Sequence, residues 1–203
     1  MICQLTSIVR DYAKLMAFGA ICAVPLNAHA DWRLVNADSK LNFISIKAAH
    51  IAEQHSFGTL SGAVKEDGRA HLNIDLASVN TRIEIRDQRM RDLLFKVADF
   101  PSADFNTVMD LDAATALAVG EQTELSVRGK LRVQDIYTDL ETEVTAVKLA
   151  DNRVMVTTNK PVLLNASPLG LADGVEQLRA IAKLPGISLA VPVTFQLVFE
   201  KTP

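Results

Sequence analysis

The stretch AHLNIDL, residues 70–76, points most directly to a fold. Its apolar residues Ala70, Leu72, Ile74 and Leu76 alternate strictly with His71, Asn73 and Asp75. Because successive side chains of a β-strand point to opposite faces, this period of two predicts a strand with one apolar face and one wet face. Strands of this kind are typical of antiparallel sheets that pack one face and expose the other.

The same pattern continues along much of the chain. Alternating or β-rich segments cover residues 125–128, 131–134, 136–149, 154–158 and 191–200. Turn-forming residues such as Gly68 and Gly120 separate these segments. About six to nine short strands at this spacing predict an all-β sandwich or barrel. Near the start, the alternation shifts by one residue between Phe43 and Ile46, which predicts a β-bulge there.

Two segments follow a helical period instead. In residues 86–97, Met90, Leu93, Leu94 and Val97 recur at spacings of three and four. The second helix opens with a capping box at residues 173–176 and stops at residues 185–186. Its inner face is expected to carry Val175, Leu178, Ile181 and Ala182. Two short helices on an all-β body are expected to act as lids or plugs at the ends of a barrel.

Composition limits the classes of protein to consider. The chain has 203 residues, of which 49% are hydrophobic and 22% charged, with a net charge of −3. These values are typical of one globular domain. A nucleic-acid-binding protein normally shows an excess of basic residues, so no nucleic-acid partner is expected.

Residues 1–30 resemble a secretory signal peptide. A polar start is followed by an apolar run at 15–24, and Ala28-His29-Ala30 has the small-x-small pattern of a cleavage site. The run is too short to span a bilayer, so we expect no permanent membrane anchor, although a retained amphipathic anchor is the alternative. Cleavage after Ala30 leaves a single domain of residues 31–203.

Removal of this segment also removes every cysteine. Cys3 and Cys22 both lie within it, and Ile21 stands before Cys22 where a lipoprotein signal would need a small residue. The mature chain then has no thiol for a disulfide, a nucleophile or a zinc–thiolate site.

Three stretches of the mature chain resemble the YceI-like family of periplasmic lipid-binding proteins. The agreement in order and spacing extends from Trp32 to Glu200. The first stretch consists of residues 38–43 and 57–62. The second consists of Ser78-Val79-Asn80-Thr81, Arg86-Asp87, Met90-Arg91, Phe95 and residues 100–105. The third consists of residues 129–135.

The resemblance implies a lipocalin-like, eight-stranded antiparallel β-barrel. The two short α-helices expected above would pack on this barrel. It also implies a periplasmic protein that carries or sequesters a long isoprenoid-type lipid, such as an isoprenoid quinone or a polyprenyl lipid. An eight-stranded barrel has room for packed side chains or for one slender ligand. With the apolar row of each strand facing inward, the expected lipid-binding residues are Phe43, Phe57, Phe105 and Phe195, together with Arg86 and Phe95 of the first predicted helix.

Arg86 has two interpretations. It lies on the apolar side of its helix, where an unpaired charge is costly. It could meet a ligand head group, or it could pair with a carboxylate and fix the helix to the barrel. The pairing role is favoured, because it explains the residue without a ligand.

Evidence for a chemical or metal site is weak. Glu53 and His55 share one face of a strand while His50 lies on the other, which predicts a polar cluster at the rim rather than a metal site. His71 is expected to face solvent. No nucleophile elbow, phosphate loop or dinucleotide motif occurs, so neither a catalytic residue nor a cofactor other than the lipid ligand is expected.

Two alternatives to a lipid carrier stay open. One is a stress-response or protein-binding module whose barrel is filled by its own side chains, with an unknown protein partner. The other, less favoured, is an enzyme built on a barrel scaffold. A cavity, a filled interior or a cleft with bonded titratable groups would distinguish the three.

Overall fold

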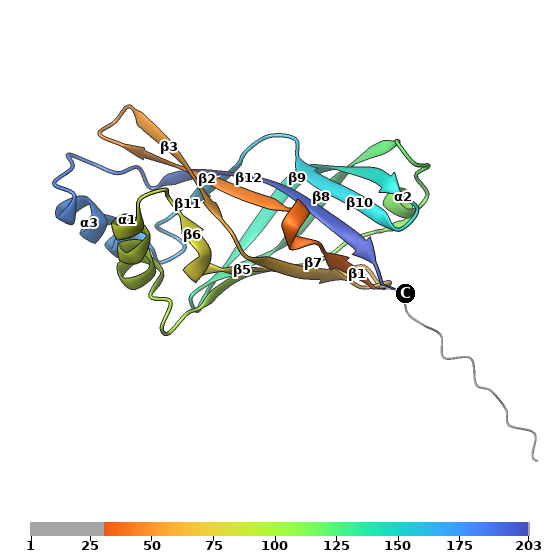
Figure 1. Cartoon of the computed structure of the whole chain (residues 1–203), viewed down its shortest axis with the longest axis horizontal. Coiled ribbons are helices and arrows are strands. Elements are labelled where there is room, and N and C mark those ends of the chain that lie inside the picture. Colours follow the sequence, from red (N-terminus) through yellow and green to blue (C-terminus); the bar gives the residue numbers. More distant parts are fainter. Residues whose placement is uncertain (1–30, 203) are drawn as a thin grey trace, which may run out of the picture.

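The computed structural model describes residues 31–202, so the expected signal peptide and its cleavage site lie outside the described residues. The chain forms one twisted antiparallel barrel with helices mainly at one end (Figure 1). Its strands are β1 (Trp32–Leu34), β2 (Lys40–Lys47), β3 (Ile51–Phe57), β4 (Leu60–Val64), β5 (Arg69–Asp75), β6 (Val79–Asn80), β7 (Ser102–Val108), β8 (Gln122–Val133), β9 (Ile136–Ala150), β10 (Arg153–Thr158), β11 (Val162–Asn165) and β12 (Ala190–Lys201).

The barrel closes between the two ends of the described chain. The strand order β1-β4-β5-β7-β8-β9-β10-β12 returns to its start because β12 also pairs with β1. In that pairing Trp32 lies opposite Lys201 and Leu34 opposite Phe199. Within residues 31–202, this ring confirms the eight-stranded antiparallel barrel.

The long strand β12 pairs with two shorter strands, one after the other, along each of its edges. On one side of β12, β10 pairs with residues 196–200 and β11 with residues 190–193. On the other side, β1 pairs with residues 199–201 and β2 with residues 193–196. These breaks let β2, β3 and β11 extend the wall beyond the ring toward the helices (Figure 1).

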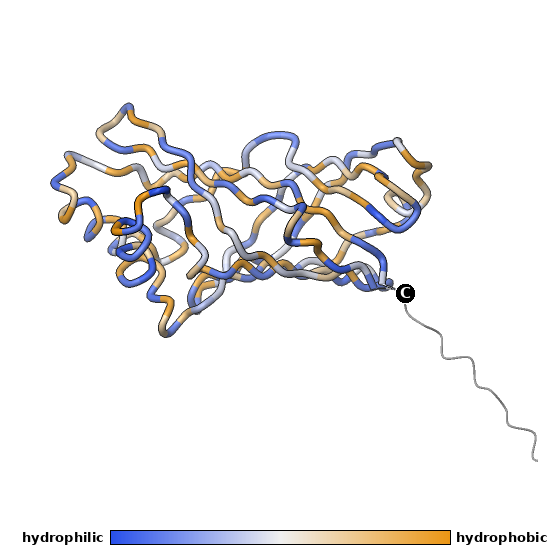
Figure 2. Tube along the Cα trace, in the orientation of Figure 1, coloured by the Kyte–Doolittle hydropathy of each residue, from blue (hydrophilic) through white to orange (hydrophobic). Residues whose placement is uncertain are grey.

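The bulge predicted between Phe43 and Ile46 is absent, because β2 pairs with β3 without a register shift from Leu41 to Lys47. The inward row of β2 changes instead from Leu41 and Phe43 to Ser45 and Lys47, all of which line the interior. The alternation of apolar residues shifts by one position because the inward side chains of β2 become polar at the end near the helices. Figure 2 shows the alternation that most strands of the barrel retain.

The first predicted helix is present but has a different winding. It consists of α1 (Glu84–Arg89) followed by a π-helical segment, η3 (Met90–Phe95). The wider π-turn changes which side chains face the core. Met90, Leu94 and Phe95 are buried, whereas Leu93 and Val97 of the predicted stripe are only partly buried.

The second predicted helix is α3 (Ala172–Ile181), and its predicted capping box is absent. Its N-cap is Leu171, which makes no side-chain capping bond. Val175 and Leu178 face the interior as expected, but Ile181 is 44% exposed. A third helix, α2 (Asp112–Thr115), was not predicted and lies at the opposite end of the barrel (Figure 1).

Both predicted helices lie at the same end and pack on each other. Gly174 makes this close approach possible, because a Cβ atom there would stand 2.8 Å from the Cα of Leu94 in η3. The two helices therefore form one joint cover over that end of the barrel rather than one lid at each end.

Candidate functional site

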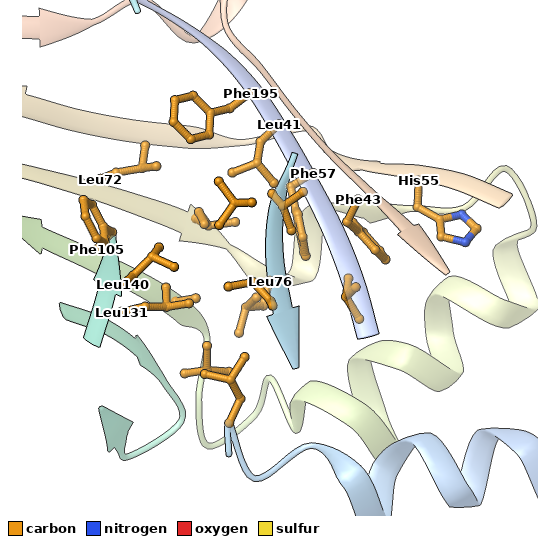
Figure 3. A pocket seen from close by; sticks show the side chains of 18 of the residues that line it. Leu41, Phe43, His55, Phe57, Leu72, Leu76, Phe105, Leu131, Leu140 and Phe195 are labelled. Carbon is orange, nitrogen blue, oxygen red and sulfur yellow. The ribbon is translucent and has the colours of Figure 1, made fainter. Parts of the chain in front are cut away.

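The barrel encloses a cavity of about 630 Å³ that extends between its two ends. Its wall is made almost entirely of apolar side chains from the inward rows of the strands, joined by residues of the helices. In Figure 3, Leu72, Phe105 and Phe195 lie toward one end of the view, and His55 lies at the other end near the helices. Protein interiors are normally packed with few voids larger than a water molecule, so a space of this size is a candidate ligand site.

Each of the six residues that the sequence suggested for lipid binding lines this cavity. Phe43, Phe57 and Phe95 form an aromatic series whose successive ring centroids lie 5.3 and 5.8 Å apart. Phe105 and Phe195 come from β7 and β12 further along the barrel. Phe105 lies over Gly129 of the neighbouring strand β8, where a Cβ atom would come within 2.5 Å of its ring.

The sixth residue, Arg86, belongs to a polar cluster at the helical end of the cavity. Its guanidinium donates to Oε2 of Glu53 at 2.8 Å and to the carbonyl of Thr81 at 2.8 Å. Lys47 of β2 also reaches Oε2 of Glu53, at 2.8 Å. The pairing of Arg86 with a strand carboxylate confirms its role in joining α1 to the barrel. Its Nε is buried and has no hydrogen-bond partner among the described residues.

His55 lies beside this cluster and is only 4% exposed. Its Nε2 and the hydroxyl of Ser45 are 2.8 Å apart, and its ring lies 5.1 Å from that of Phe43. Burial lowers the pKa of His55 to about 4, and the positive charge of Arg86 adds to this effect. Its imidazole is therefore neutral near pH 7, and its buried Nδ1 lacks a partner within residues 31–202.

Hydrogen bonds from Lys47 and Arg86 hold the pKa of Glu53 below its usual range, although desolvation partly opposes them. Glu53 is therefore a carboxylate shared by two cations. The sequence placed Glu53 and His55 on one face, and the structure confirms this. Ser45 and Lys47 were missed, although the parity shift in β2 was their signal.

Asp87 anchors the start of α1. It is 5% exposed and accepts hydrogen bonds from the backbone N–H of Thr81, at 2.8 Å, and from the Thr81 hydroxyl, at 2.5 Å. Thr81 is itself only 2% exposed. This buried contact fixes the segment that connects β6 to α1, and so positions Arg86 over the cavity.

The remaining histidines do not join the cluster. His50 lies in the turn between β2 and β3, and His71 is exposed on β5, as expected. No group of three or more potential metal ligands of the His, Cys, Asp or Glu type occurs in residues 31–202.

The end of the barrel near α2 has a different polar residue. Lys148 of β9 is 8% exposed, and its ammonium lies 5.6 Å from the centroid of the Trp32 ring. No ion pair joins Lys148 to a carboxylate within the described part of the chain. The cavity wall at this end includes Trp32, Leu111 and Ala114.

The helices of residues 31–202 include none with the length and apolar character needed to cross a bilayer.

Comparisons with known proteins agree with this architecture. The family model described as the YceI-like domain matches residues 32–199. A solved polyisoprenoid-binding domain from Saccharophagus degradans, described as implicated in plant cell wall breakdown, is 39% identical with a TM-score of 0.82; the match covers 84% of this chain and 98% of that one.

More distant structures share the fold. BcnA from Burkholderia cenocepacia is 20% identical with a TM-score of 0.63, over 81% of this chain and 98% of that one. A YceI protein from Campylobacter jejuni is 15% identical with a TM-score of 0.54, over 73% and 84% of the two chains. The comparison with curated proteins gave no match.

Proposed function

This chain belongs to the YceI-like family, and from that premise we propose that it carries or sequesters one long isoprenoid-type lipid, such as an isoprenoid quinone or a polyprenyl lipid, inside its barrel. The observation that carries the proposal is the apolar cavity of about 630 Å³. Transfer from water contributes roughly 0.8 kcal/mol for each buried methylene, so a long chain gains affinity from the wall alone.

The cavity also bears on the two alternatives. A protein-binding module with a filled barrel does not fit an interior that retains this much apolar space.

For an enzyme, the hydrogen bond between Ser45 and His55 is the relevant observation. A nucleophile–base pair needs a third group that orients the base, and His55 Nδ1 has no partner among the described residues. With a pKa of about 4, His55 is also a weak general base near neutral pH.

The proposed orientation places the lipid head group at the polar cluster and the chain toward α2. Two buried nitrogens, Nδ1 of His55 and Nε of Arg86, remain without a partner in residues 31–202. A buried polar group without a partner is costly, so a polar head group at this position would relieve that cost. Exported through the proposed signal peptide of residues 1–30, the protein would act in the periplasm.

The test is lipid retention in lumen variants. Phe43→Arg introduces a charge into the apolar wall, so the folded variant should retain at least about tenfold less lipid. Leu163→Arg is the matched control, because Leu163 is 75% exposed on the outer face of β11. Protein purified without detergent is extracted with organic solvent, and isoprenoid lipid is quantified per mole of folded protein.

A second variant covers the case in which Phe43→Arg does not fold. Val193→Trp narrows the cavity without adding a charge, since Val193 lines the wall on β12. Native mass spectrometry should show wild type with bound lipid and the variant without it. Equal lipid in wild type and a folded lumen variant would refute the proposal.

A further inference from the structure

Four exposed isoleucines lie at the helical end of the barrel, on β3 and on the segments of α1 and α3. Ile51 at the start of β3 is 50% exposed, Ile83 and Ile85 around the start of α1 are 47% and 58% exposed, and Ile181 at the end of α3 is 44% exposed. We call these four residues the isoleucine collar. Ile83 and Ile85 also line the cavity, so the collar is continuous with its wall.

Hydrogen bonds connect the segments that carry the collar to the β2–β3 hairpin. Arg82 donates to the carbonyl of Gln54, which ties the start of α1 to β3. The segment after α3 is tied to β2, because Ala48 N–H donates to Gly186 O at 2.9 Å and Ser188 N–H to Ile46 O at 2.8 Å. In Figure 1 the β2–β3 hairpin, α1 and α3 lie together at this end of the molecule.

The tip of the β2–β3 hairpin is unusually apolar for a protruding turn. Ala48 and Ala49 have positive φ angles of 47° and 65°, positions that favour Gly, Asn or Asp. A left-handed backbone is strained at an L-residue with a Cβ atom. The turn thus presents the methyl groups of Ala48 and Ala49 next to Ile51, at a position where a turn exposed to water normally carries polar residues.

Unpaired positive charge accompanies the collar. Arg82, Arg89 and Lys183 form no ion pair with a carboxylate in residues 31–202. Most carboxylates of β3, α1 and α3 already have a partner. Glu53, Glu84 and Glu176 each form an ion pair with Lys or Arg, and Asp87 is buried and accepts hydrogen bonds from Thr81. Asp173 at the start of α3 is the exception in these three elements. The segments that carry the collar, residues 47–55, 82–92 and 172–188, hold seven Lys or Arg against six Asp or Glu, whereas the whole chain has a net charge of −3.

We propose that the isoleucine collar docks the helical end of the barrel onto the surface of an anionic lipid bilayer, where the isoprenoid chain enters and leaves. This inference rests on the proposed function, because a membrane lipid must cross to the cavity. Exposed apolar groups next to basic side chains are the combination that binds the interface of anionic membranes. Docking also shortens the path of the isoprenoid chain through water, where each exposed methylene group is unfavourable.

Vesicle flotation tests the docking. Wild type should float with vesicles of phosphatidylcholine and phosphatidylglycerol, and Ile83→Asp/Ile85→Asp should reduce the bound fraction at least about tenfold by charging the apolar contact. Val108→Asp/Val119→Asp is the matched control, because these valines are 70% and 58% exposed near the α2 end. Circular dichroism checks that each variant is folded.

Charge and lipid composition give a second arm. Arg82→Gln/Lys183→Gln should weaken binding to anionic vesicles, and high salt should do the same to wild type. Equal flotation of wild type and the Ile83→Asp/Ile85→Asp variant would overturn the proposal. Absence of wild-type flotation would also overturn it and leave a protein partner as the occupant of the collar.

A parallel measurement separates this proposal from the function itself. Isoprenoid lipid is added from solvent without vesicles, and uptake is followed by native mass spectrometry. Uptake without vesicle binding would refute docking alone, whereas no uptake by wild type would refute the lipid-binding function.

Discussion

The two ends of the barrel both contain inward-facing or buried charged residues, but they satisfy them differently. At the helical end, Lys47, Glu53 and Arg86 form a bonded network beside the His55–Ser45 pair. At the α2 end, Lys148 rests against the ring of Trp32 without a carboxylate partner in the described chain. The first arrangement is built from directional hydrogen bonds and leaves two buried nitrogens without a partner among the described residues, whereas the second only shelters a charge. The difference supports the proposed position of the lipid head group at the helical end.

Removal of the anchor at the helical end should have the largest effect on stability. Asp87→Ala leaves the buried N–H and hydroxyl of Thr81 without their acceptor. Loss of a buried, charged hydrogen-bond partner costs about 4 kcal/mol of unfolding free energy. Urea denaturation measures this loss, with Asp92→Ala on the exposed face of η3 as the control. Similar losses in the two variants would mean that the anchor does not stabilise the helical end.

Protonation of His55 should weaken the same end in a defined pH window. The pKa of His55 is about 4 in the folded chain and near 6.5 when unfolded, so the unfolded chain takes up this proton first as the pH falls. Its contribution to stability is thus complete above about pH 6.5 and is lost toward pH 4, by about 3 kcal/mol.

Urea denaturation across this range should show a smaller pH dependence for His55→Gln than for wild type. His71→Gln is the matched control, since His71 is exposed on β5. Parallel pH profiles for wild type and His55→Gln would contradict the assigned burial of the neutral ring.

Substitution of Lys148 at the α2 end should have the smallest effect on the free energy of unfolding. Lys148→Met shortens the side chain by one atom and removes a buried charge, so the loss of about 0.5–2 kcal/mol of cation–π attraction is offset by a lower desolvation cost. We expect the unfolding free energy to change by less than about 1 kcal/mol, measured as above. A loss comparable to that of Asp87→Ala would show that both ends depend on their charges equally.

The barrel could be predicted from the sequence because its strands alternate with a period of two over long stretches. The wall of the cavity followed from the same alternation together with the family resemblance. The helix α2 was missed because four residues are too few to show a helical period. The π-turn of η3 was missed because the pattern of apolar residues also suits an ordinary α-helix.

The polar cluster was harder to predict, because its bonds join distant parts of the sequence. Arg86 and Glu53 are 33 residues apart, and no local pattern specifies that pair. The parity shift in β2 was visible, but a bulge and a polar inner face both explain it, and only the register with β3 distinguishes them. Ile181 was expected inside because it fits the helical stripe, yet it lies where α3 ends and the chain turns away.

The pairing of β1 with β12 has a consequence for how the chain folds. Trp32 and Lys201 are neighbours in the ring although almost the whole described chain, residues 31–202, lies between them. Proteins dominated by such non-local pairings have a high contact order, and the entropy of closing long loops makes them fold slowly. A chain emerging from the ribosome cannot close this ring until its last strand has appeared. The order of the strands thus delays closure of the barrel until β12 has been synthesised.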